Sequence, residues 1–298
     1  MLALSVDTGD AGFPDQGLLW SWMEQLELTA LVPGIAATTP SLVSFRRQHQ
    51  VQIPAIRMSQ PMTSTRGVTA SLTHPDSAQQ RQWIEAAVKT AESATELRSP
   101  WVIVELGELR SEAPSRQIDW FNPDPQETAD NGSYRQTAIT HSSAFQEHLV
   151  KQSNSLLDAI CRGLFEVRRR VPEVGLAIAL PSGFPGLPTA DMLEAILEDL
   201  DDRVGYWHDT GRARCLAELE HTPSEEVWMD RFADRCIGVD LTDCMSGFAG
   251  LPAGAGELDF VAIRAALGQG MVKVVRADPF PGPAPLRAAV DLLRGLGI

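Results

Sequence analysis

Short runs of aliphatic and β-branched residues alternate with longer amphipathic stretches along the whole chain. The short runs predict strands at residues 2–6, 28–33, 52–58, 101–106, 174–180, 203–208, 236–242 and 271–277. Helical periodicity predicts helices at residues 16–26, 40–49, 75–97, 143–171, 189–200, 213–233 (broken at Pro223), 257–268 and 283–296. Strict alternation without a glycine-rich turn after the first strand favours a single (β/α)8 TIM barrel, an α/β fold, over residues 1–298.

One polar segment interrupts this alternation. Residues 107–142 contain three prolines and three aromatic residues among charged ones. The segment follows the fourth predicted strand, which places it on the face of the barrel where (β/α)8 enzymes build their active sites. Two interpretations stay open: a lid that brings aromatic side chains over a ligand, or a flexible insertion or contact between copies in a homo-oligomer.

The alternation of side chains along each strand predicts which residues point into the barrel. In the fifth strand Leu176 and Ile178 face the helices, so Ala177 and Ala179 point inward. By the same parity His208 faces the helices. Charged residues occupy several inward positions near the strand ends. Six are expected to converge on one mouth: Arg57, Glu105, Asp209, Arg212, Asp240 and Arg276.

The last third of the chain carries three motif-like segments. Residues 209–213 read Asp-Thr-Gly-Arg-Ala, residues 240–243 read Asp-Leu-Thr-Asp, and residues 254–260 read Gly-Ala-Gly-Glu-Leu-Asp-Phe. They resemble, in the same order, the Asp-Thr-Gly-His-Ala, His-Leu-x-Asp and Gly-x-Gly-x-x-Asp-Phe motifs of the xylose isomerase-like superfamily. That superfamily includes sugar phosphate isomerases/epimerases and proteins similar to AP endonuclease family 2. The resemblance implies a (β/α)8 barrel and isomerase or epimerase activity on a sugar-like substrate.

The resemblance also implies a divalent cation, held in the epimerase branch by a strand-five glutamate, an aspartate, a histidine and a strand-eight glutamate. At the first three matching positions this chain has Ala179, Asp209 and Asp240. The strand-eight glutamate matches Arg276 or a residue beside it. A substrate-contacting histidine of the family matches Arg212. Alanine supplies no ligand atom, and a guanidinium repels a cation but pairs with carboxylates. We therefore expect a degenerate metal site and no cofactor, with arginines pairing with the two aspartates.

A rebuilt cation site is the alternative. Asp209, Asp240, Glu105 and His208 offer oxygen and imidazole ligands that suit manganese, zinc, cobalt or magnesium. The other histidines are scattered over predicted helices and loops. This scatter argues against the multi-zinc site of the family's DNA-repair branch.

The segment Gly254-Ala255-Gly256 has two interpretations. It forms either a phosphate cradle at the start of the following helix or a tight turn that requires small residues. Two glycines alone do not decide between them.

Composition limits the class of partner. A net charge of −14 argues against binding the backbone of a nucleic acid, which requires clustered Lys and Arg. No apolar run is long enough to span a bilayer. Four cysteines without a CxxC spacing, and an N-terminus without a signal-peptide pattern, predict a cytoplasmic protein with reduced thiols.

Two functions remain open. In an isomerase or epimerase, the candidate catalytic residues are Glu105, Asp209 and Asp240. The candidates for binding a polyhydroxylated or anionic metabolite are Arg57, His208, Arg212 and Arg276. The second function is a non-catalytic barrel that binds a metabolite or a protein partner. Ala179 favours this second function, because an alanine cannot act as the base.

Overall fold

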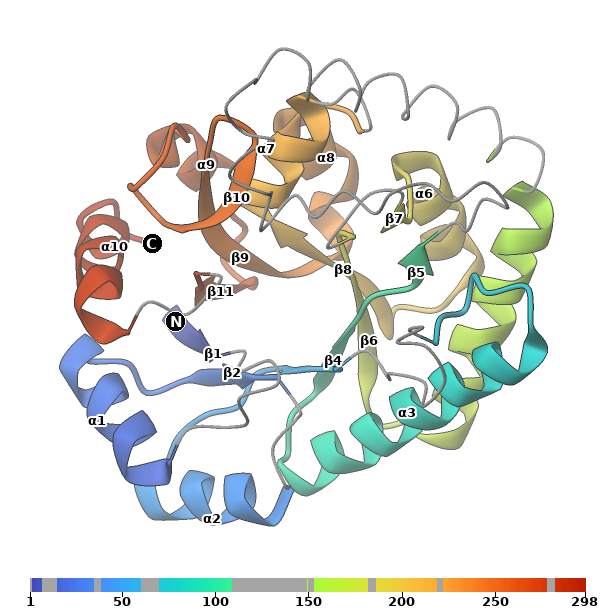
Figure 1. Cartoon of the computed structure of the whole chain (residues 1–298), viewed down its shortest axis with the longest axis horizontal. Helices are drawn as coiled ribbons and strands as arrows, with labels where there is room; N and C mark the ends of the chain where they lie inside the picture. Colours follow the sequence, from blue (N-terminus) through green and yellow to red (C-terminus); the bar gives the residue numbers. More distant parts are fainter. Residues whose placement is uncertain are drawn as a thin grey trace, which may run out of the picture.

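A computed structural model shows a nearly closed barrel of parallel strands inside a ring of helices (Figure 1). It describes residues 2–6, 15–34, 39–59, 70–108, 149, 153–181, 186–218, 222–277 and 282–298. The predicted TIM-barrel fold is confirmed. Within the described ranges, no helix is long and apolar enough to cross a membrane.

Eight parallel strands form the barrel. They are β1 (Leu2–Val6), β2 (Leu31–Pro33), β3 (Ile56–Arg57), β4 (Trp101–Val104), β6 (Gly175–Ala179), β8 (Val204–Asp209), β9 (Cys236–Met245) and β11 (Val272–Val275). They are hydrogen-bonded in the order β2-β1-β11-β9-β8-β6-β4-β3. Bridges from Ala30 to Gln52 and from Gly34 to Arg57 link the two ends of this row. Each predicted strand coincides with one strand of the barrel.

Helices surround the strands at the positions that periodicity predicts. They are α1 (Gln16–Leu26), α2 (Thr39–His49), α3 (Ser77–Glu96), a helix over 153–170, α6 (Ala190–Asp199), α7 (Thr210–Glu218), α8 (Glu225–Phe232), α9 (Phe260–Ala266) and α10 (Pro283–Gly295). Aspartates cap three of them: Asp15 accepts from Gly17 N at 2.8 Å, and Asp76 and Asp259 cap α3 and α9 in the same way. The stretch 213–233 forms two helices on either side of Pro223, as expected.

Most of the polar segment 107–142 lies outside the described residues, which end at residue 108 on this side. Gly107 and Glu108 form strand β5, which pairs antiparallel with β7 (Gly186–Leu187). Both interpretations of this segment, a lid or a flexible insertion or contact between copies, stay predictions.

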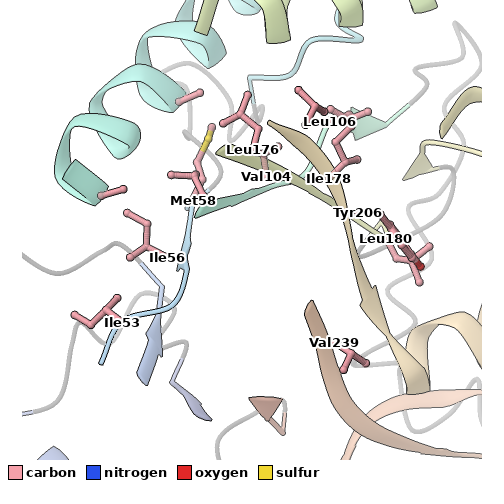
Figure 2. Close-up of a cluster of buried hydrophobic side chains, with 14 of the residues drawn as sticks. Ile53, Ile56, Met58, Val104, Leu106, Leu176, Ile178, Leu180, Tyr206 and Val239 are labelled. Atoms are coloured by element: carbon pink, nitrogen blue, oxygen red, sulfur yellow. The ribbon is translucent and has the colours of Figure 1, made fainter. Parts of the chain in front are cut away.

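Buried side chains form two layers, one on each side of the strands. The outer layer packs between the strands and the helices and includes Ile178, Tyr206 and Val239 (Figure 2). The inner layer fills the barrel and consists mainly of small residues with Trp207: Ala3, Ala30, Val32, Ala55, Ile103, Ala177, Ala179, Trp207 and Val274. The predicted inward and outward parity of the fifth strand is confirmed.

The tryptophan in the barrel interior requires a glycine on the neighbouring strand. A Cβ at Gly238 of β9 would lie 2.4 Å from the ring of Trp207 on β8. Trp101 lies against Gly175 in the same way, with a Cβ at 2.2 Å from its ring. Small residues next to these rings therefore keep the interior close-packed.

Strand β9 continues beyond the barrel as a hairpin that sequence patterning does not predict. Ser246 and Gly247 have positive φ values of 52° and 84°, which suits a two-residue hairpin turn. The chain then returns as β10 (Phe248–Pro252), antiparallel to β9. The predicted strand 236–242 is thus extended to Met245, and the Gly-x-Gly loop follows β10.

Candidate functional site

The centre of the barrel mouth is occupied by one buried carboxylate between two guanidinium groups. Arg57 Nη2 lies 2.6 Å from Asp240 Oδ2, and Arg276 Nη1 lies 3.0 Å from the same oxygen. Arg276 Nη1 also lies 3.8 Å from Asp209 Oδ2. Arg276 is thus positioned between two carboxylates of neighbouring strands.

Arg212 extends this arrangement toward the fourth strand. Its Nε lies 3.4 Å from Asp209 Oδ2, and its Nη1 lies 3.3 Å from Glu105 Oε1. The six side chains therefore form a row of alternating charge, which we call the mouth cluster: Arg57, Asp240, Arg276, Asp209, Arg212 and Glu105. The structure brings together all six charged residues that the sequence predicts at the mouth.

The strand register explains why this cluster needs cations. Asp209 on β8 lies directly opposite Asp240 on β9. Two like charges at opposing positions of a parallel pair repel each other. Arg276, which follows β11 on the other side of β9, contacts both carboxylates and relieves this repulsion.

Burial makes these pairs strong. The side chain of Asp240 is 1% exposed, and those of Asp209 and Arg276 are each 5% exposed. Burial alone would raise the pKa of Asp240, but Arg57 and Arg276 outweigh it and hold that pKa below its usual range. Burial lowers the pKa of Arg57, while Asp240 opposes this change. Asp240 is therefore a weak base.

Asp209 is fixed by a second set of contacts at the junction of β8 and α7. Thr242 Oγ1 donates to Asp209 Oδ1 at 2.6 Å, and the backbone N–H of Arg212 donates to the same oxygen at 3.0 Å. Thr242 Oγ1 also accepts from Gly211 N at 3.1 Å. Sequence reasoning missed Thr242, although it lies two residues after Asp240 and so shares its inward parity.

Several polar atoms of the barrel interior lack a hydrogen-bond partner among the described residues. They include Ser5 Oγ, Trp207 Nε1 and Asp240 Oδ1. The indole N–H of Trp207 contributes to the lowered pKa of Asp240, but the two groups do not meet in hydrogen-bond geometry. Buried polar groups normally have partners, so these unsatisfied atoms are exceptions in the barrel interior.

His208 lies apart from the mouth cluster. Its Nδ1 lies 2.5 Å from the hydroxyl of Tyr206, and its Nε2 lies 3.6 Å from Glu225 Oε1 of α8. The Tyr206 ring stacks on Trp228 of the same helix. His208 thus packs between barrel and helix, as parity predicts, and the structure does not bring it to the other candidate substrate-binding residues.

The Gly-x-Gly loop already surrounds a carboxylate of the chain itself. Asp243 Oδ2 accepts from Gly254 N at 3.0 Å and from Gly256 N at 2.9 Å. Its Oδ1 accepts from Leu258 N at 3.0 Å and from Cys244 N at 2.8 Å. A Cβ at Gly256 would lie 2.1 Å from Cys244 O. The loop is therefore a tight turn around Asp243, and the phosphate-cradle interpretation is wrong because these N–H groups are occupied.

The described residues of the mouth do not offer a ligand set for a divalent cation. In the part of the chain that the structure describes, no three His, Cys, Asp or Glu side chains form a group that could hold a metal ion. Asp209 and Asp240 both face guanidinium groups. Ala179, at the inward position that matches the family's strand-five glutamate, belongs to the apolar filling of the barrel.

Comparison with known proteins identifies the fold. No protein-family model matches the chain, and no curated protein matches its sequence. Among solved structures, a D-tagatose 3-epimerase-like protein aligns with a TM-score of 0.64 and 14% identity, over 99% of this chain and 96% of that one. A xylose isomerase domain protein from Planctomyces limnophilus aligns with 0.63 and 14%, over 99% and 95%. An AP endonuclease of family 2 from Brucella melitensis aligns with 0.62 and 8%, over 99% and 98%.

These similarities cover almost the full length of both chains in each comparison. At such low identity they show the fold alone, a (β/α)8 TIM barrel that this chain shares with the compared structures. The resemblance of the three motifs and the structural comparisons therefore agree on architecture. The chemistry has to be argued from the mouth cluster.

Proposed function

We propose that the protein binds a small polyhydroxylated or anionic metabolite at the mouth of the barrel, without a bound divalent cation. It is a sugar isomerase/epimerase-like barrel in which guanidinium groups take the place of the cation. The observation that carries this proposal is the position of Arg276, between Asp209 and Asp240. A cation at this point would have to displace a guanidinium that already pairs with both carboxylates.

The polar atoms around the cluster support a hydroxylated ligand. Asp240 Oδ1 is an acceptor, Trp207 Nε1 is a donor, and Ser5 Oγ can serve as either. A sugar hydroxyl both donates and accepts, so it matches such a set of partners. The three arginines pair with all three carboxylates, so the cluster has no net charge. An anionic group of the ligand would compete with these carboxylates for the guanidinium groups.

Catalysis is the second candidate function, and one observation favours it. The side chain of Glu105 is 20% exposed, which makes it the most accessible carboxylate of the cluster. We propose Glu105 as the proton-transfer group of any isomerase or epimerase activity, with Arg212 orienting it at 3.3 Å. Against this function, Ala179 supplies no second base, and Asp240 is held ionised by two arginines.

Thermal unfolding with a panel of ligands tests the binding proposal. We expect sugar acids or sugar phosphates to raise the melting temperature, and EDTA or added manganese, zinc, cobalt or magnesium to leave it unchanged. Arg212→Gln should abolish the response to ligand. Arg214→Gln, on the same helix but 53% exposed and paired with Glu218, should keep it.

Elemental analysis and an isomerisation assay separate the two candidate functions. Stoichiometric metal in the purified protein would overturn the metal-free mouth. Turnover of a ligand found by thermal shift, lost in Glu105→Gln while binding persists, would establish the catalytic function. Binding without turnover would support the metabolite-binding function and not the catalytic one.

A further inference from the structure

A basic site lies at the end of the barrel opposite the mouth cluster. A pocket of about 500 Å³ lies where α2 and α3 end and where the chain enters β3 and β4. These two helices are neighbours in the outer ring (Figure 1). The lining of the pocket includes Arg46 and Arg47 of α2 and Arg98 just after α3. The mouth cluster lies at the other ends of the same strands, so the two sites are separate.

The charge of this pocket contrasts with that of the rest of the molecule. The chain has 39 acidic and 25 basic residues. None of the nine residues that line the pocket is acidic, and three of them are arginines. Unlike those of the mouth cluster, the side chains of these three arginines make no ion pair or hydrogen bond with any described residue. No carboxylate in the described part of the chain therefore compensates their charges.

Helix electrostatics explain only part of this arrangement. Arg46 and Arg47 lie in the last turn of α2, where cations favour the helix dipole. This does not account for Arg98, which lies beyond the end of α3 in a left-handed conformation with φ of 51°. Gln50, also in the lining, has φ of 55°. Both residues come directly after a helix end, where a left-handed residue is a common way for a helix to terminate, so their conformation fixes the shape of the pocket rim.

We infer that this pocket binds a small molecule that carries a phosphate group. Guanidinium groups pair bidentately with phosphate oxygens, and Gln50 and Gln52 add amide donors at the same site. Val51, Ile53 and the two prolines Pro54 and Pro100 provide an apolar wall for the body of the ligand. The volume suits a metabolite, and the net charge of −14 opposes the approach of an extended polyanion such as a nucleic acid.

Isothermal titration calorimetry with inorganic pyrophosphate tests this inference on the full chain. We expect saturable binding with one site per chain, and an affinity weaker by about tenfold or more in Arg46→Gln/Arg98→Gln. Arg81→Gln/Arg264→Gln is the charge-matched control, because both are exposed arginines outside the pocket. It should bind like the wild type. All variants change exposed or half-buried side chains, and their thermal melts verify folding.

Three results would overturn the inference. They are no saturable binding of pyrophosphate to the wild type, equal affinity in the double variant, or equal affinity for sulfate at the same ionic strength. Tighter binding of a single-stranded oligonucleotide than of pyrophosphate would also overturn it, in favour of a nucleic-acid surface. The Arg212→Gln variant should bind pyrophosphate normally, so failure of the mouth proposal and failure of this one are distinguishable.

Discussion

The guanidinium of Arg276 reaches backward along its strand to lie 3.0 Å from Asp240 Oδ2. In the register of β11 and β9, Val274 is the residue opposite Asp240, and Arg276 follows two positions later. The side chain therefore turns down into the barrel and does not extend toward solvent. This conformation lets one arginine contact the aspartates of two strands.

Removal of Arg276 should be strongly destabilising. Arg276→Met leaves Asp209 and Asp240 opposite each other with one cation fewer, and loss of one partner of a buried pair costs about 3 kcal/mol. Urea unfolding at neutral pH measures the change in the free energy of unfolding. As a control, Arg162→Met removes a partner of Asp158 whose side chains are 69% and 68% exposed, and should cost less than about 0.5 kcal/mol. Equal losses in the two variants would contradict the role of burial.

Asp240 should make stability depend on acid pH. Its pKa is lower in the folded protein than the unfolded value of about 3.9, so the folded state binds fewer protons. Its contribution is complete above that unfolded value and is lost as pH falls through the folded pKa. Between pH 6 and pH 3, unfolding free energy should fall more steeply in the wild type than in Asp240→Asn. The exposed Asp234→Asn serves as a control and should follow the wild type.

Asp243 should be essential to the hairpin and the loop after it. Asp243→Ala leaves four backbone N–H groups without their acceptor, at a cost of about 3 kcal/mol. Asp259→Ala, which removes only the cap of α9, should cost about 1 kcal/mol. Calorimetric unfolding of both variants compares the two losses. A smaller loss at Asp243 than at Asp259 would contradict this account of the loop.

Gly238 should tolerate no side chain. In Gly238→Ala the new Cβ meets the ring of Trp207 at 2.4 Å, and overpacking of this kind costs about 2 kcal/mol. Gly270→Ala meets no atom within 4 Å and should change stability by less than about 0.5 kcal/mol. Chemical denaturation compares the free energy of unfolding of the two variants. Equal stability would mean that the Trp207 ring can shift to make room for the new Cβ.

The sequence predicts well what depends on local periodicity. The inward positions of Ala177, Ala179 and Asp240 follow from the alternation of side chains along a strand, which holds wherever the strand itself is recognised. The break at Pro223 follows from proline's missing N–H. Five members of the mouth cluster follow in the same way, because parallel strands end at one face of the barrel, whereas Arg212 lies in the first turn of α7 directly after β8.

Contacts between distant parts of the chain are what the sequence does not predict. Arg57 makes the shortest contact with Asp240, yet β3 and β9 are not neighbours in the sheet, so this contact depends on the width of the mouth. The contact between the Gly-x-Gly loop and Asp243 is likewise not predicted by the sequence. Whether its N–H groups face a phosphate or Asp243 depends on a hairpin whose turn, at Ser246-Gly247, gives only a weak signal in the sequence.

The mouth cluster has a consequence for the approach of the metabolite that we propose as its ligand. Its three arginines and three carboxylates cancel, so the net charge of −14 arises entirely from the remainder of the chain. An anionic metabolite on its way to the mouth is therefore repelled at long range and attracted only at contact. Salt screens the repulsion over about 10 Å at 0.1 M, so the association rate of such a ligand should increase with ionic strength. This is the reverse of what is expected for an anion guided to a basic surface.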